Sequence, residues 1–362
     1  MRYLSIDILR TVAIFVMVQV HFVGNLSGFH HPGPAGFGAP LFAFLLGVSY
    51  FLWLENPRVR KTKDSEISKI SIRRGLFLFG VGILFNVFVW LPEDAFIWDI
   101  LTFLGVGLIV LNGARKLPSS ILLMICAVIF VISPTLRVLT EYPAYWTSNT
   151  FDFDLTLSDV LLGFLVNGYF PIFPWIVYPI VGFVVTSRLM PPDTTCPPAT
   201  LNRLTYIGVG LLGAWIAATL LRPHSPSIVQ NIWLEGWRMF PASVEYMLGT
   251  LGLAITAFTL LHRWVDATSV IPKDSKLAQV FTIFGPRALS VYVLHHLVHI
   301  WPLWIYGMVT GPEPTAHWQK ALPITVSWPL AFVFLGLCYW LLQWMTRTGK
   351  PGMETLMRWL CD

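Results

Sequence analysis

The sequence predicts an all-α, polytopic transmembrane helix bundle, and its composition, its apolar runs and its charge distribution each point to that class. Of the 362 residues, 55% are hydrophobic and only 12% are charged, and the mean hydropathy is +0.66. Soluble domains carry about 25% charged residues. The composition therefore excludes an ordinary soluble domain and indicates a chain that lies in a lipid bilayer.

Ten apolar runs have the length of a membrane span. An eleventh segment, at about 155–169, is too short to cross and is expected to be re-entrant or interfacial. The first run lacks a small-residue cleavage site and is interrupted by polar groups, so we expect it to remain as a span. The ten runs lie at about 6–24, 37–54, 75–91, 97–113, 119–139, 172–187, 204–221, 243–261, 287–307 and 322–345.

The positions of lysine and arginine predict the orientation of these spans. With both termini cytoplasmic, 19 Lys and Arg lie inside and 4 outside, and loop 55–74 alone holds seven. This asymmetry follows the positive-inside rule. The net charge of +5 is then a topology signal, and no nucleic-acid partner is expected.

The chain offers few motifs of soluble enzymes. The loops are short, so we expect one integral-membrane domain over residues 1–345 and a short cytoplasmic tail over residues 346–362. Its four cysteines form no CxxC motif and no Cys/His spacing typical of a metal site, so no metal is expected. Nucleotide-binding glycine motifs and a Gly-x-Ser-x-Gly elbow are also absent. Any chemistry must therefore be done by the membrane core.

The first span carries ionisable groups near both ends. The stretch "LRTVAIFVMVQVH" runs from Leu9 to His21 and begins one residue before Arg10. On a helix Arg10 and His21 share one face and lie about 16 Å apart, with Asp7 one turn before Arg10. Such groups face a bundle interior or a watery cavity. Asp7 and Arg10 form a structural ion pair, or Arg10 contacts an anionic ligand from the cytoplasm.

Three histidines gather at the outer end of the first span. His21 is followed by Asn25, His30 and His31, before glycine and proline break the helix. Histidine titrates near neutrality and can take a proton from a hydroxyl or an amine. The alternative is that they are ordinary loop histidines with satisfied hydrogen bonds.

Two later segments bring polar groups to the same outer face. Asp99 opens an apolar helix and could hold a histidine in one tautomer. Tyr292, His295 and His299 follow at i, i+3 and i+7 on one helix face. Without a third ligand, this His-x-x-x-His pair is expected to line a polar channel or to contact substrate.

Five motifs in order resemble a known family. "SIDILRTVAIFVMVQVH" resembles the first helix of integral-membrane acyltransferases, in which Arg and His are separated by ten residues. Together with "GAPLFAFLLGVS", "FPIFPWIVYPIVGF", "FPASVEYMLGTLGLA" and "FGPRALSVYVLHHLVH", it resembles the bacterial branch of the heparan-alpha-glucosaminide N-acetyltransferase catalytic domain family. The resemblance runs from residue 2 to about residue 300. It implies a bacterial or archaeal cytoplasmic membrane protein.

The resemblance also implies an activity: transfer of an acetyl group from cytoplasmic acetyl-CoA to an amine or hydroxyl of a sugar or another polar acceptor across the bilayer. Catalysis in the family belongs to a histidine on the non-cytoplasmic side. Lysosomal members carry Asn where this chain has His21, and their histidine lies about eleven residues later, near His30 and His31. Both choices stay open, as does an acyl-histidine intermediate.

The positions of the remaining polar residues fit that scheme. Arg73 and Arg74, at the mouth of the third span, are candidates to hold the CoA phosphates together with Arg10. Asn25, Tyr292 and His295 are candidates for acceptor binding, and His21, His30, His31 and Asp99 for catalysis. The alternative function is a proton-coupled secondary transporter that uses Asp7, Arg10 and the histidines. Transporters show inverted repeats, and no such symmetry is visible here.

Overall fold

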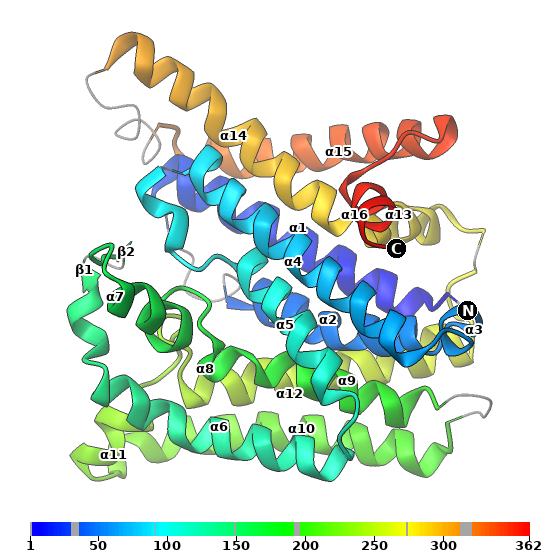
Figure 1. The fold of residues 1–362 in the computed structure, drawn as a ribbon, viewed down its shortest axis with the longest axis horizontal. Coiled ribbons are helices and arrows are strands. Elements are labelled where there is room, and N and C mark those ends of the chain that lie inside the picture. The colour runs from blue at the N-terminus through cyan, green and yellow to red at the C-terminus, as the bar shows by residue number, and fades with distance from the viewer. Residues whose placement is uncertain are drawn as a thin grey trace. The chain divides into compact units, whose positions relative to one another are not determined.

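The computed structural model describes residues 2–29, 36–90, 92–147, 150–191, 196–272, 274–311 and 321–362 (Figure 1). Within these residues the chain is almost entirely helical, and its strands, β1 (Trp146–Thr147) and β2 (Thr150–Phe151), form one antiparallel pair. The chain divides into two compact units. The central unit comprises residues 40–260, and the terminal unit joins residues 2–39 to residues 261–360.

The helices of the central unit follow the predicted apolar runs. Their bounds are α2 (Gly38–Leu54, which begins in the terminal unit), α3 (Pro57–Arg60), α4 (Asp64–Val89), α5 (Ile100–Ala114), α6 (Ser119–Leu139), α7 (Leu157–Leu162), α8 (Ile172–Trp175), α9 (Val177–Leu189), α10 (Pro198–Leu221), α11 (Ser227–Ile232) and α12 (Val244–Leu261). The predicted short segment at about 155–169 is α7 followed by one π-helical stretch, Gly163–Asn167.

Glycines let α4 and α5 approach closely. A Cβ on Gly75 would lie 2.7 Å from the carbonyl oxygen of Gly105, and a Cβ on Gly105 would lie 2.5 Å from that of Gly75. Any larger residue at either position would therefore push the two helices apart. Small residues at helix contacts are the usual means of close packing in a bilayer, where no hydrophobic force drives helices together.

The terminal unit is built around the first helix. Its helices are α1 (Leu4–Ser27), α13 (Lys276–Phe284), α14 (Ala288–Thr310), α15 (Ile324–Thr348) and α16 (Met353–Cys361). Helix α1 packs against α13, α14 and α15. Phe22 of α1 is 1% exposed, and its ring lies 5.3 Å from that of Phe334 on α15 and 4.6 Å from that of His299 on α14. This packing fixes the rotation of α1 against α14.

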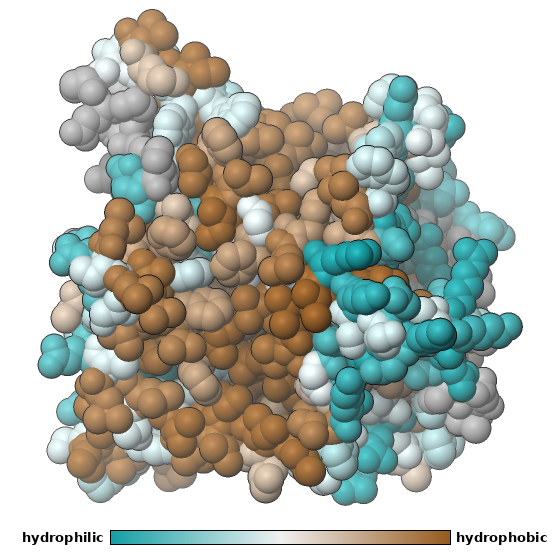
Figure 2. Space-filling view, in the orientation of Figure 1, coloured by the Kyte–Doolittle hydropathy of each residue, from teal (hydrophilic) through white to brown (hydrophobic). Residues whose placement is uncertain are grey.

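The fold class predicted from the sequence is confirmed. Nine helical stretches of the described residues are long and apolar enough to cross a membrane, and α2 adds a shorter apolar helix. Large apolar side chains such as Leu84, Val128 and Leu337 are exposed on these helices, as expected for surfaces that face lipid. Figure 2 shows apolar residues over much of one face and hydrophilic residues toward α3 and the start of α4. The cytoplasmic location of the termini stays a prediction.

The predicted tail contains a helix that is tied to α14. The Glu354 carboxylate of α16 accepts hydrogen bonds from the backbone N–H of Ser290 at 2.9 Å and from its hydroxyl at 2.6 Å. The Ser290 hydroxyl in turn accepts from the Met353 N–H at 2.9 Å. These bonds hold α16 against the start of α14. The domain bounds expected from the sequence, 1–345 and 346–362, stay a prediction.

Candidate functional site

Two helices of the terminal unit, α1 and α14, bring four imidazoles and one amide together. His21 Nδ1 lies 2.8 Å from His295 Nε2, and Asn25 Nδ2 lies 2.9 Å from His299 Nε2. Residues four apart occupy one helix face, so the two pairs lie one turn apart along the same contact. His296 adds the fourth ring, 4.5 Å from that of His21 and 3.9 Å from that of His295. We call these five residues the histidine cluster.

Only one histidine of the cluster is accessible to a ligand. His295, His296 and His299 are 0%, 1% and 4% exposed, whereas His21 is half-buried. Aromatic rings line the cluster, because Tyr292 packs edge-on to His295 at 5.7 Å and Phe22 packs on His299. The residue with access is therefore His21.

Hydrogen bonds to backbone carbonyls fix the tautomers of the α14 histidines. The Nδ1 atoms of His295, His296 and His299 lie 3.1, 3.2 and 2.5 Å from the carbonyl oxygens of Val291, Tyr292 and His295. A carbonyl only accepts, so each Nδ1 carries a proton. Burial disfavours the charged imidazolium, which leaves a lone pair on each Nε2.

These tautomers determine the state of His21. The lone pair on His295 Nε2 requires a donor, so His21 donates its Nδ1–H across the 2.8 Å contact. Neutral His21 then carries its own lone pair on Nε2. In the same way the Asn25 amide donates to His299 Nε2. His21, the most exposed histidine of the cluster, therefore carries a basic nitrogen at Nε2.

At the other end of α1, the predicted ion pair is present. Asp7 is 3% exposed, and its carboxylate lies 3.7 Å from Arg10 and 2.6 Å from Arg2, which also donates to the Thr282 carbonyl. Thr11 donates to the Asp7 carbonyl oxygen at 2.7 Å. Because Asp7 has two cationic partners, it does not depend on Arg10 alone. A role of Arg10 in holding an anionic ligand stays a prediction.

The other predicted phosphate ligands lie in the central unit. Arg73 is exposed near the start of α4, and the Arg74 guanidinium carbon lies 4.8 Å from the centre of the Trp53 ring on α2. Arg58, Arg60 and Lys61 are exposed in the preceding segment. The region is basic and accessible, as phosphate binding requires.

The structure brings none of the remaining described candidates from the sequence into the histidine cluster. Asp99 immediately precedes α5 in the central unit, where its backbone carbonyl accepts from Thr102 at 2.6 Å, and its pairing with a histidine stays a prediction. His30 and His31 lie outside the described residues. His296 was missed from the sequence, although the adjacent histidines of "LHHLVH" were a visible signal.

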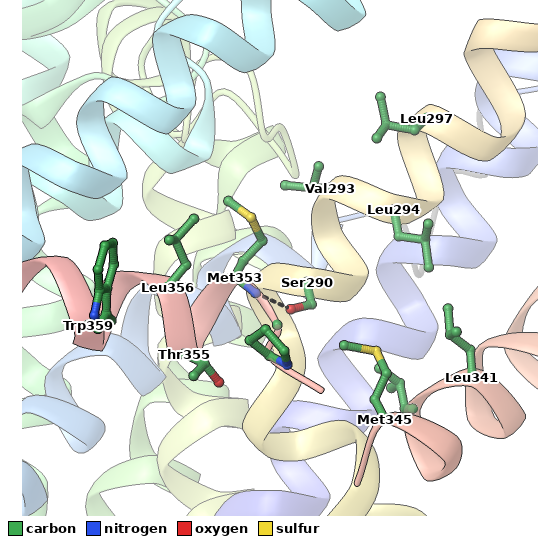
Figure 3. Close-up of a pocket in the computed structure, with 13 residues that line it drawn as sticks. Ser290, Val293, Leu294, Leu297, Leu341, Met345, Met353, Thr355, Leu356 and Trp359 are labelled. Atoms are coloured by element: carbon green, nitrogen blue, oxygen red, sulfur yellow. Dashed lines mark hydrogen bonds between the residues drawn. The ribbon is translucent and has the colours of Figure 1, made fainter. Parts of the chain in front are cut away.

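A large groove of the terminal unit lies apart from this chemistry. It encloses about 710 Å³ between α14, α15 and α16 and is lined by apolar residues such as Val293, Leu297 and Leu341 (Figure 3). The hydroxyl of Ser290, one of the residues that line it, already accepts from Met353. No histidine lines the groove. It is therefore not the candidate site.

The central unit holds a second buried ionic group. Arg137 donates to the Glu235 carboxylate at 2.7 Å and to the Ala242 carbonyl at 3.2 Å, and the two charged side chains are 6% and 17% exposed. Burial raises the pKa of Glu235, while the charge of Arg137 lowers it by a smaller amount. This pair joins the end of α6 to the segment before α12.

Comparison with known proteins supports the resemblance seen in the sequence. The family model described as heparan-alpha-glucosaminide N-acetyltransferase, catalytic, matches residues 2–216. The match includes His21 and Asn25 on α1, whereas the α14 histidines lie beyond it. No match was found among curated proteins.

Proposed function

The chain belongs to the heparan-alpha-glucosaminide N-acetyltransferase catalytic family, and from that premise we propose that it moves an acetyl group from cytoplasmic acetyl-CoA to an amine or hydroxyl of a glycan-like acceptor on the opposite side. The family membership carries the reaction class: a membrane acetyltransferase. One observation carries the choice of base. His21 is the accessible histidine of the cluster, and the bond from its Nδ1 to His295 leaves its Nε2 free.

The proposed reaction needs one base that later acts as an acid. His21 Nε2 takes the proton of the acceptor amine or hydroxyl as that nitrogen or oxygen attacks the thioester carbonyl. The bond to the acceptor forms, the carbon–sulfur bond breaks, and the same proton passes from His21 to the CoA thiolate. His295 acts as a positioning residue, because its Nε2 holds the proton of His21 at Nδ1.

Two alternatives within this proposal stay open. His21 Nε2 could attack the thioester itself and form an acyl-histidine, which the acceptor then opens. His30 or His31 could serve as base in place of His21, with Asp99 as its partner. The assignment of Asn25, Tyr292 and His295 to acceptor binding also stays a proposal. Asn25 and His295 already bind other members of the cluster, which favours a positioning role.

The proposed binding of acetyl-CoA, the acetyl donor, is argued from charge. CoA carries several negative charges on its nucleotide, and exposed Arg73 and half-buried Arg74 belong to a basic segment at the start of α4. Arg10 is 25% exposed along its side chain and shares Asp7 with Arg2, and its positive charge would attract a phosphate.

The test uses detergent-purified protein and acetyl-CoA with a labelled acetyl group, offered with amino sugars and oligosaccharides. Mass spectrometry should find the label on an acceptor, and transfer should fall in His21→Ala but not in His224→Ala, an exposed histidine of the central unit. Absence of labelled product with every acceptor, together with normal binding of acetyl-CoA, would contradict the proposal.

A proton-coupled transporter is the second candidate, and the buried hydrogen-bonded histidines of α14 favour it. The two functions differ in what they require. Acetyl transfer proceeds in detergent without a proton gradient, whereas coupled transport needs sealed vesicles. Proton-driven uptake by proteoliposomes that show no acetyl transfer would support the transporter.

A further inference from the structure

Three rings of the histidine cluster converge in the way that metal ligands do. Among the residues that the structure describes, one ring nitrogen each from His21, His295 and His296 lies within 4.8 Å of the other two. The ring centres lie 5.1, 4.5 and 3.9 Å apart. His299 lies one turn farther along α14 and is not part of this triad.

The Nδ1 hydrogen bonds of His295 and His296 are also of the kind found at metal sites. Metal-binding histidines almost always donate the other ring N–H to a carbonyl or carboxylate, which fixes the ring and leaves one nitrogen for the ion. His295 and His296 do this through Nδ1 to Val291 and Tyr292. These bonds fix the orientation of both rings, as the second bonds of metal-binding histidines do.

We propose that His21, His295 and His296 bind one divalent transition-metal ion, of which zinc is the best fit. Imidazole suits Zn²⁺, Cu²⁺ and Ni²⁺, and three histidines with an open fourth position are a known zinc arrangement. The triad contains no carboxylate, so it does not suit Mg²⁺ or Ca²⁺, which take oxygen ligands. The sequence alone predicted no metal, because the His295–His299 pair had no third ligand.

A bound metal ion and the proton shared by His21 and His295 exclude each other. His21 Nδ1 and His295 Nε2 share one proton at 2.8 Å, and a metal needs the lone pairs of both atoms. Zinc–nitrogen bonds of about 2.0–2.1 Å in a tetrahedron place ligand nitrogens about 3.4 Å apart, so the rings must separate slightly. The His21 proton then moves to Nε2, and no basic nitrogen remains. Bound metal is therefore inhibitory, a consequence that rests on the proposed function.

The test measures metal binding directly. Detergent-purified protein is stripped with a chelator and titrated with Co²⁺, whose visible d–d bands report a tetrahedral nitrogen site. We expect one equivalent bound in the wild type and in His299→Gln, the matched control on α14. We expect affinity to fall at least about 10-fold in His296→Gln and in His21→Gln. The absence of a d–d signal in the wild type, or equal binding by His296→Gln, would overturn the proposal.

A Zn²⁺ titration of acetyl transfer separates this proposal from the proposed function. Inhibition at the concentration that fills the Co²⁺ site supports both. One bound equivalent without inhibition keeps the metal site and contradicts His21 as the base. Normal catalysis that is lost in His21→Ala, with no bound metal at all, keeps the function and removes the metal site.

Discussion

His21 on α1 and His295 on α14 share one proton across 2.8 Å, and their rings lie 5.1 Å apart with 17° between their planes. Residues 274 positions apart in the chain thus set each other's chemistry. The Val291 carbonyl fixes His295, and His295 fixes His21. The reactivity of His21 Nε2 therefore depends on both residues.

Replacing His21 removes the proposed base. We expect His21→Ala to lower the turnover of acetyl transfer by about 10²–10⁴-fold, because general base catalysis contributes that much. The acidic limb of the pH–rate profile should disappear with the imidazole. Thermal shift should still detect acetyl-CoA binding. Near-normal turnover in His21→Ala, with an inactive His31→Ala, would assign the chemistry to the loop histidine.

His295 should act through His21 and not on the substrate. His295→Phe removes the acceptor for the His21 Nδ1–H, so both tautomers of His21 become populated. We expect turnover to fall by about 10–100-fold with little change in KM for acetyl-CoA, as for other partners that orient a ligand. His295→Gln, whose carbonyl can accept the same proton, should restore part of the activity. A rise in KM for the acceptor alone would instead indicate direct substrate contact.

Arg2 and Arg10 allow a matched comparison at the other end of α1, because both contact Asp7. Each single alanine variant leaves buried Asp7 with one cation, so we expect either to lower stability by less than the roughly 3–5 kcal/mol of a buried charge left with no partner. Only Arg10→Ala should also raise KM for acetyl-CoA. Melting temperature and steady-state kinetics separate the two effects. Equal KM values in the two variants would leave Arg10 a structural role.

Arg73 and Arg74 should be needed for stabilisation by acetyl-CoA. A ligand that binds only the folded state at 100 times its Kd adds about 2.7 kcal/mol, which a melting curve detects. We expect this shift to shrink in the Arg73→Ala/Arg74→Ala variant. The Arg58→Ala/Lys61→Ala variant removes the same charge from the same segment and serves as control. Equal loss of the shift in both variants would indicate non-specific attraction.

The sequence predicts the spans well because their signal is local. A helix that crosses a bilayer needs about 20 apolar residues, and the runs around Leu84 and Leu337 meet that need by themselves. No comparable local signal shows which helices pack against α1. Helical spacing relates His21 to Asn25 and His295 to His299, but the packing of Phe22 between α14 and α15 decides that these faces meet.

Two features of the structure were not predicted from the sequence, each for a specific reason. His296 lies 100° around the helix from His295, so a one-face pattern leaves it out, yet α14 lies close enough to α1 for both rings to reach His21. Helix α16 is too short and too polar to register as a span. Its attachment depends on Glu354 binding Ser290, 64 residues away, a contact that hydropathy cannot report.

The Arg137–Glu235 pair of the central unit tests the fold independently of catalysis. Arg137→Leu leaves Glu235 without the guanidinium that offsets its burial, so we expect stability to fall by about 3 kcal/mol. Glu235→Gln should be milder, because a neutral amide costs less to bury. The measurement is the melting temperature of each purified variant. A smaller drop in Arg137→Leu than in Glu235→Gln would show that the pair does not stabilise the fold.

The pH dependence of the same pair has a definite sign. Burial raises the folded-state pKa of Glu235 above its ordinary value of 4.5, so the folded protein holds this proton more tightly than the unfolded chain. The stability that the group contributes is present below pH 4.5 and is lost as the pH rises through the raised pKa. Relative to Glu235→Gln, which cannot titrate, the wild type should lose stability on raising the pH through that window. A relative gain would mean that Arg137 lowers the pKa by more than burial raises it.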